Sequence, residues 1–168
     1  MTDLIQIRRL GEKKRGENSK FRLHLKSRDY PDRRFRRIAE GIEEEIDCRA
    51  CANCCKVAST PVTERDVERF AKHLRIRVAE FVQRYTTPEP EGKGLILQRT
   101  EKGCVFLDGN DCTVYEERPH NCADFPHVVR GAGSITRRMW QFIDRACYCP
   151  IVYNTLEAFK DETGFQRR

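Results

Sequence analysis

The stretch CRACANCC, residues 48–55, holds four of the nine cysteines of this chain. The other five lie in the second half of the chain, at Cys104, Cys112, Cys122, Cys147 and Cys149. A Cys-x2-Cys step lets the backbone reverse around a tetrahedral ion and point N–H groups at the sulfurs. The spacing therefore predicts a fold organised around a cysteine-ligated metal centre.

The number of metals depends on the adjacent pair Cys54 and Cys55, whose side chains diverge and do not easily bind one ion together. Two separate four-coordinate sites would use eight thiolates, whereas three metals would need all nine, with three of them bridging. We favour two sites, with these ligands: Cys48, Cys51, Cys54, Cys55, Cys104, Cys112, Cys122 and Cys149. Cys147 is then the spare thiol, and His120 and His127 are nitrogen donors of lower rank.

The identity of the metal is open between zinc and iron. Cys48-x2-Cys51-x2-Cys54 is typical of a run that holds three irons of a cubane cluster, and Cys149-Pro150 supplies a distant cysteine followed by proline. Arg118, which precedes Pro119, would offset the negative charge of a tetrathiolate site. The alternative for this arginine is a surface salt bridge with Glu116 or Glu117.

Composition indicates a soluble protein with a modest core. The chain has 168 residues, of which 35% are charged, and this length normally forms one domain. No run approaches the roughly 20 apolar residues that cross a bilayer, and the first residues lack the apolar region of a secretory signal. We therefore expect a cytoplasmic protein without membrane contact. In a reducing compartment, nine cysteines favour metal ligation over disulfides.

Positive charge is concentrated at the start of the chain. Residues 1–37 carry 13 Lys and Arg against 5 Asp and Glu, while the whole chain has a net charge of +6. We expect a partly disordered, basic N-terminal extension over residues 1–37, followed by a cysteine-cluster metal-binding domain over residues 38–168. Residues 1–30 should be dispensable for the fold and the metal content of that domain. The extension could attract an acidic protein or nucleic acid through counterion release, or it could be a solvated arm.

Hydrophobic spacing predicts a small, helix-rich α+β domain with a short β-hairpin. Apolar residues at three- and four-residue steps predict a helix over residues 32–47. Thr63-x-x-Asp66 is typical of a cap that starts a helix, and further helices are expected over residues 78–85 and 150–162. A strand over 95–98 should pair with 104–107 across a turn at 102–103, and 108–111 should form another turn.

Several ordered motifs resemble one known family. They are Cys48-x2-Cys51-x2-Cys54-Cys55, Thr63-x-x-Asp66, Phe81-x3-Tyr85, Cys104-x-Phe106-Leu107, Cys112-x-Val114-Tyr115-x2-Arg118-Pro119-x2-Cys122 and Phe125-Pro126. Together they resemble the YkgJ-like family, also described as the CxxCxxCC or zinc- or iron-chelating domain, over roughly residues 48–150. Ala52 stands where many members have glycine, and Ala123 where an arginine is frequent.

The resemblance implies zinc or iron chelation and leaves two function classes open. Members are often labelled iron–sulfur oxidoreductases, and a similar array in flagellin lysine N-methylases implies a protein-modifying accessory role by analogy. The alternative is a zinc-stabilised, non-enzymatic binding module for a protein or nucleic-acid partner. No serine–histidine–acid pattern, phosphate loop or dinucleotide fingerprint indicates an independent enzyme, so catalytic residues are unassigned.

Overall fold

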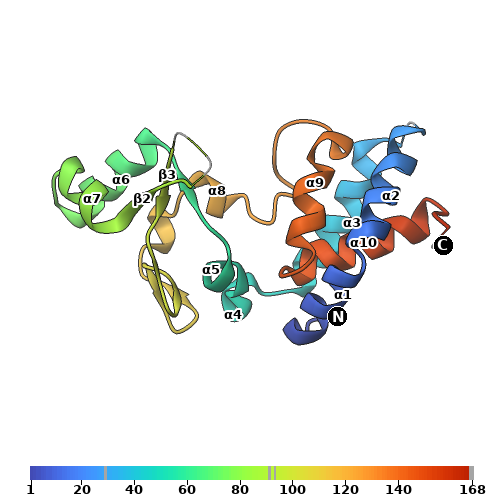
Figure 1. Ribbon diagram of the computed structural model, residues 1–168, viewed down its shortest axis with the longest axis horizontal. Helices are drawn as coiled ribbons and strands as arrows, with labels where there is room; N and C mark the ends of the chain where they lie inside the picture. The colour runs from blue at the N-terminus through green and yellow to red at the C-terminus, as the bar shows by residue number, and fades with distance from the viewer. Residues whose placement is uncertain (29, 91, 93, 167–168) are drawn as a thin grey trace. The chain divides into compact units, whose positions relative to one another are not determined.

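The structure, a computed structural model, describes residues 1–28, 30–90, 92 and 94–166. Its contacts divide the chain into two compact units (Figure 1). Unit 1 is formed by Met1–Cys48 with Pro126–Arg168, and unit 2 by Arg49–Phe125. Helices predominate and the sheets are small and antiparallel, which confirms the α+β class. No helix among the described residues is long and apolar enough to span a bilayer.

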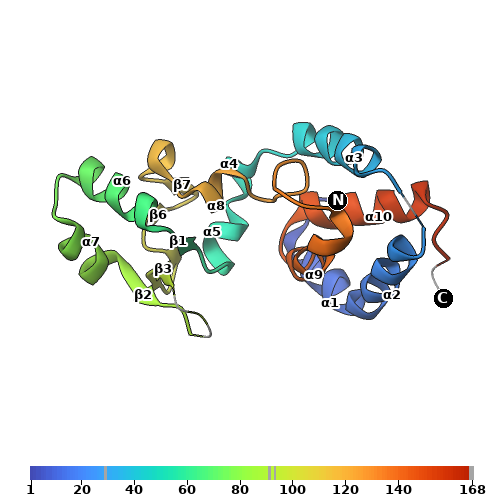
Figure 2. The same cartoon turned by 90° about the horizontal axis from the view of Figure 1, so that it is seen from above.

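Unit 1 is a group of helices around α10 (Figure 2). Its elements are α1 (Leu4–Lys13), α2 (Arg15–Lys26), α3 (Asp32–Glu45), α9 (Ile135–Arg145) and α10 (Pro150–Glu162). Helix α10 packs against α1, α3 and α9, and α2 packs against α9. Phe21, Phe35 and Phe159 are fully or almost fully buried between them, and the Phe159 ring centroid lies 5.2 Å from that of Phe35 and 5.9 Å from that of Phe21.

The first 26 residues are part of this core, in contrast to the partly disordered, dispensable extension that the charge predicts. Ile7, Phe21 and Leu25 are buried along α1 and α2. A Cβ on Gly11 would lie 2.6 Å from the carbonyl oxygen of Ala146, so α1 approaches the end of α9 closely. The expected boundary after residue 37 falls inside α3, and residues on both sides of it belong to unit 1.

Ion pairs join this segment to α10. The Lys160 ammonium is fully buried and lies 2.5 Å from Glu17 and 2.6 Å from Glu157. Lys14 also pairs with Glu157. Glu157 of α10 thus compensates Lys14, which the charge pattern places in a solvated arm, because the pattern cannot show which segments meet.

Unit 2 contains short elements in chain order. They are α4 (Cys48–Cys51), α5 (Asn53–Val57), β1 (Pro61–Val62), α6 (Glu64–Leu74), α7 (Val78–Tyr85), β2 (Thr86–Pro88), β3 (Leu95–Leu97), β4 (Arg99–Thr100), β5 (Gly103–Cys104), β6 (Leu107–Asp108), β7 (Asp111–Cys112), the 3-10 turn η1 (Tyr115–Glu117) and α8 (His120–Ala123). One sheet has the antiparallel order β1-β3-β2, and β4–β5 and β6–β7 are two small hairpins.

An aromatic stack fills the core of unit 2. The Phe70 ring of α6 lies 5.2 Å from Phe81 of α7 and 5.3 Å from Phe106, and all three are buried. The predicted cap of α6 is confirmed, because Thr63 and Asp66 form a complete capping box. The core therefore fixes α6 as a rigid element beside the small hairpins.

The predicted hairpin is present in part. Strand β4 pairs with β5 across the expected turn, and the Val105 N–H donates to the Gln98 carbonyl at 2.9 Å. Leu95–Leu97 does not pair with residues 104–107, however, but with β1 and β2 on its two edges. This strand therefore lies in the middle of the sheet, and its residues Ile96 and Leu97 are both buried.

Candidate metal centre

Four thiols of unit 2 lie near enough to one another to affect each other's ionisation. They are Cys55 of α5, Cys104 of β5, Cys112 of β7 and Cys122 of α8. Each is partly buried. Sulfurs from four separate elements therefore share one neighbourhood, although they are far apart in the sequence.

The ionisation of these thiols is uneven. A hydrogen bond from Cys54 lowers the pKa of Cys55 to about 7 despite its partial burial. Burial raises the pKa of Cys104 and Cys112, and it raises the pKa of Cys122 to about 12, with the neighbouring thiols adding to each shift. A bound cation reverses this order, because a coordinating thiol is deprotonated outright. The donor set thus fits a thiophilic metal ion.

The ligands do not form a closed shell in this structure. Nowhere in residues 1–28, 30–90, 92 and 94–166 do three or more His, Cys, Asp or Glu side chains stand close enough together to hold a metal ion. The four thiols share one neighbourhood, and soft thiolate donors of this type select zinc or iron–sulfur clusters.

The turn between α4 and α5 depends on Ala52. This residue has φ 46° and ψ 15°, the left-handed conformation that glycine adopts without cost and that costs other residues about 1–2 kcal/mol. This left-handed conformation is the physical reason why glycine suits the position of Ala52. Arg99 of β4 holds the other end of α5, since its guanidinium donates to the carbonyls of Lys56 and Ala58, each at 2.5 Å.

Two turn residues bring the hairpins to the cysteine helices. Gly103 has φ 129°, and a Cβ there would lie 2.6 Å from the carbonyl oxygen of Cys55, so only glycine lets β5 approach α5 this closely. Asn110, in the turn of the second hairpin, donates to the Ala50 carbonyl at 2.8 Å and accepts from Lys56 at 2.5 Å. Sequence reasoning treated both as turn residues and missed these contacts.

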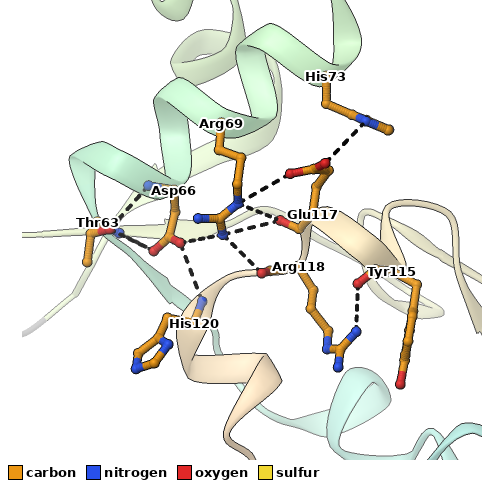
Figure 3. Close-up of polar contacts among 8 residues, drawn as sticks. All are labelled: Thr63, Asp66, Arg69, His73, Tyr115, Glu117, Arg118 and His120. Carbon is orange, nitrogen blue, oxygen red and sulfur yellow. Dashed lines mark hydrogen bonds and ion pairs between the residues drawn. The ribbon is translucent and has the colours of Figure 1, made fainter.

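The loop before Cys122 is held by α6 (Figure 3). Asp66 is buried and accepts hydrogen bonds from Thr63, from Arg69 at 2.7 Å and from the His120 N–H at 3.4 Å. Burial would raise the pKa of Asp66, but these hydrogen bonds outweigh it and lower the pKa. The Cys122 thiol itself donates to the Thr60 hydroxyl at 3.8 Å.

A family model described as "Putative zinc- or iron-chelating domain", CxxCxxCC, matches residues 47–150. The chain belongs to this family. "Uncharacterized protein MJ0661" of Methanocaldococcus jannaschii is 31% identical over 100 residues, which cover 55% of this chain and 52% of the relative. The chain thus spans about half the length of that curated relative. No solved structure matches the chain significantly.

Within the CxxCxxCC domain, Arg118 contacts an aromatic ring. Its guanidinium lies 3.8 Å from the centroid of Tyr115 and donates to the Tyr115 carbonyl at 2.8 Å. Arg49 lies 4.7 Å from the same centroid. The expected alternative, a salt bridge to Glu117, is made instead by Arg69 at 3.4 Å. Arg118 also acts electrostatically to lower the pKa of Cys112, against the larger effect of burial.

The remaining five cysteines differ in their burial and in their relation to the group of four. Cys54 adjoins it through its hydrogen bond to Cys55, while Cys51 is partly buried and Cys48 is exposed. Cys147 and Cys149 are buried in unit 1. No disulfide forms among the nine cysteines, all of which lie in the described residues.

Cys147 and the two histidines have other surroundings. The Cys147 thiol donates to the Ile143 carbonyl at 3.6 Å, and burial raises its pKa to about 11, which suits a spare thiol. The His120 side chain is 82% exposed and lies 3.1 Å from Asp124, whereas His127 has a left-handed backbone with φ 66°. Ligand roles for all eight cysteines expected from the sequence stay predictions.

Proposed function

We propose that this protein chelates zinc through Cys55, Cys104, Cys112 and Cys122 of its CxxCxxCC domain, and that the metal stabilises unit 2. The closeness of Cys122 to Cys55, Cys104 and Cys112 supports the proposal, together with the family description. Tetrathiolate coordination is typical of structural zinc, and its binding energy becomes folding energy.

Zinc is favoured over iron by the origin of the four thiols. A cubane cluster typically takes three of its ligands from one Cys-x2-Cys-x2-Cys run. Cys104, Cys112 and Cys122 come instead from three separate elements, which is typical of a tetrathiolate zinc site. Bound iron would add electron transfer, and zinc would supply charge neutralisation and cross-linking. Cys48, Cys51, Cys54 and Cys149 remain part of the proposal as further ligands that the sequence predicts.

The test combines metal analysis with matched cysteine variants. Anaerobically purified protein should be colourless and contain zinc, and Cys112→Ser should lose metal and melt at lower temperature. Cys147→Ser is the control, because that thiol is buried in unit 1, outside the group of four. A brown protein with iron and acid-labile sulfide would favour the oxidoreductase class. Full metal content in Cys112→Ser would refute the assignment.

A second candidate, a partner-binding role for unit 1, is favoured by the distribution of charge. Residues 1–48 and 126–168 carry 20 Lys and Arg against 14 Asp and Glu, whereas residues 49–125 carry 12 of each. Arg8, Arg9 and Lys13 are exposed on α1. We expect binding of a nucleic acid or acidic protein that weakens with salt and weakens further in Arg8→Glu/Arg9→Glu. The control is Arg75→Glu/Arg77→Glu in unit 2. If this control weakens binding as much as Arg8→Glu/Arg9→Glu does, the result argues against a binding role for unit 1.

A further inference from the structure

We propose that Asp66 and Arg69 are positioning residues of the metal site, acting as a clamp on α6 that fixes the loop delivering Cys122. The proposal rests on the proposed function, because it concerns the same site. The loop runs from Glu117 to His120 and leads directly into α8, which carries Cys122. Its backbone, rather than its side chains, receives most of the contacts from α6.

Asp66 does more than cap its own helix. One carboxylate oxygen, Oδ2, accepts from the Thr63 N–H at 3.0 Å and from the Thr63 hydroxyl at 2.8 Å, which completes the capping box. The other, Oδ1, accepts from Arg69 at 2.7 Å and from the His120 N–H at 3.4 Å. A capping residue needs only the first set, so the second oxygen ties the loop to the helix (Figure 3).

Arg69 binds two successive carbonyl groups of the loop. Its Nη2 donates to the carbonyl oxygens of Glu117 at 3.3 Å and Arg118 at 3.0 Å, and also to the Asp66 carboxylate at 2.7 Å. Its Nε lies 3.4 Å from a carboxylate oxygen of Glu117. Nη2 therefore shares its two N–H bonds among three acceptors, while Nε binds Glu117 from a second nitrogen, which the single ammonium of a lysine cannot reproduce. The backbone conformation on both sides of Arg118 is therefore fixed from α6.

The clamp restrains the position of the Cys122 thiol through a short, stiff segment. Pro119 follows Arg118, and the Cys122 N–H donates to the Pro119 carbonyl at 2.8 Å. At the other end, α6 is anchored by the buried ring of Phe70. Outer contacts of this kind orient metal ligands, and their loss typically lowers metal affinity by about 10- to 100-fold.

The test compares Arg69→Ala and Arg69→Lys with Arg84→Ala in the full-length protein. Arg84 is the matched control, because it makes an exposed ion pair with Glu80 at 2.9 Å in the same unit. In metal-free, reduced protein, alkylation of Cys122 is followed by peptide mapping, with Cys104 as the internal reference. In zinc-loaded protein, the rate of zinc loss to a chelator is measured under conditions where all variants remain folded.

We expect Arg69→Ala to accelerate alkylation of Cys122 over Cys104 by about tenfold and zinc loss by about 10- to 100-fold. Arg69→Lys should lie closer to Arg69→Ala than to wild type, and Arg84→Ala should stay within twofold of wild type. Equal acceleration at Cys104 and Cys122, or rates within twofold of the control, would overturn the clamp. Wild-type protein that binds neither zinc nor iron overturns the proposed function instead, and the alkylation ratio then decides the clamp alone.

Discussion

Replacing Lys160 by methionine should destabilise unit 1 strongly, although it preserves side-chain volume. Lys160 is fully buried and pairs with Glu17 and Glu157, and Lys14 shares the second carboxylate. These four side chains are two cations and two anions, so the cluster is neutral. Lys160→Met would leave an uncompensated negative charge against the buried side of α10.

The magnitude follows from the exposure of the partners. Removing one partner of a buried ion pair typically costs about 3–5 kcal/mol. The Glu17 and Glu157 side chains are 22% and 19% exposed, and Lys14 still pairs with Glu157, so water and Lys14 offset part of the loss. We therefore expect a loss of about 2–3 kcal/mol, or about 10–20 °C in melting temperature for a unit of this size.

Urea unfolding followed by far-UV circular dichroism is the suitable assay, because unit 1 is built of helices. Tryptophan fluorescence is less suitable, since Trp140 on α9 is already 60% exposed in the folded protein. Arg34→Met is the control, because the Arg34–Glu162 pair is half-exposed and should contribute about 0.2–1 kcal/mol. Adding Glu17→Leu to Lys160→Met should restore at least half of the loss, since an apolar replacement of both partners is nearly neutral. A loss below about 1 kcal/mol, or one no larger than in the control, would refute this reasoning.

Three further predictions concern Glu157, Gly103 and the N-terminal helices. Burial would raise the pKa of Glu157, but hydrogen bonds from Lys14 and Lys160 outweigh it and lower the pKa below 4.5. The stability from this group is therefore present above pH 4.5 and is lost as the pH falls through the lowered pKa. Thermal melts at acid pH should show this loss in wild type and less of it in Lys160→Met. Gly103→Ala should cost about 1–3 kcal/mol and reduce zinc content, measured by urea unfolding and metal analysis, whereas Gly109→Ala should leave zinc content unchanged. Deletion of residues 1–28 should abolish the cooperative unfolding transition of unit 1, measured by far-UV circular dichroism, because Ile7, Phe21 and Leu25 are part of its core. Retention of that transition would show that these helices are dispensable.

Local features of the fold were predictable from the sequence because their causes are local. The helices at residues 78–85 and 150–162 have the expected bounds, and α3 ends two residues before the expected position. The cap at Thr63 and Asp66 is present, and the turn over 108–111 joins β6 and β7, with φ 61° at Gly109. Capping and turn geometry depend on residues three or four positions apart, which a sequence displays directly.

Long-range features were not predictable in the same way. The apolar positions Ile7, Phe21 and Leu25 lie among many charged residues, so their burial becomes visible only where α10 and α9 meet them. The cysteine-cluster motif that the sequence displays is confirmed by the family. The sequence could not show which thiols gather, because that depends on contacts such as the approach of Gly103 to Cys55 and the binding of the Cys122 loop by Arg69.

The order of the two units along the chain has a consequence for synthesis. Unit 2 is an insertion, since residues 49–125 interrupt the residues that build unit 1. Helices α1 to α3 leave the ribosome first but lack α9 and α10, which carry Phe142 and Phe159 of their shared core. At about 5–20 residues per second, residues 126–168 take about 2–9 s to translate, and unit 2 can fold and take up metal during that interval. The later-starting domain is then complete first, and the nascent α1–α3 segment is the part that needs protection from aggregation.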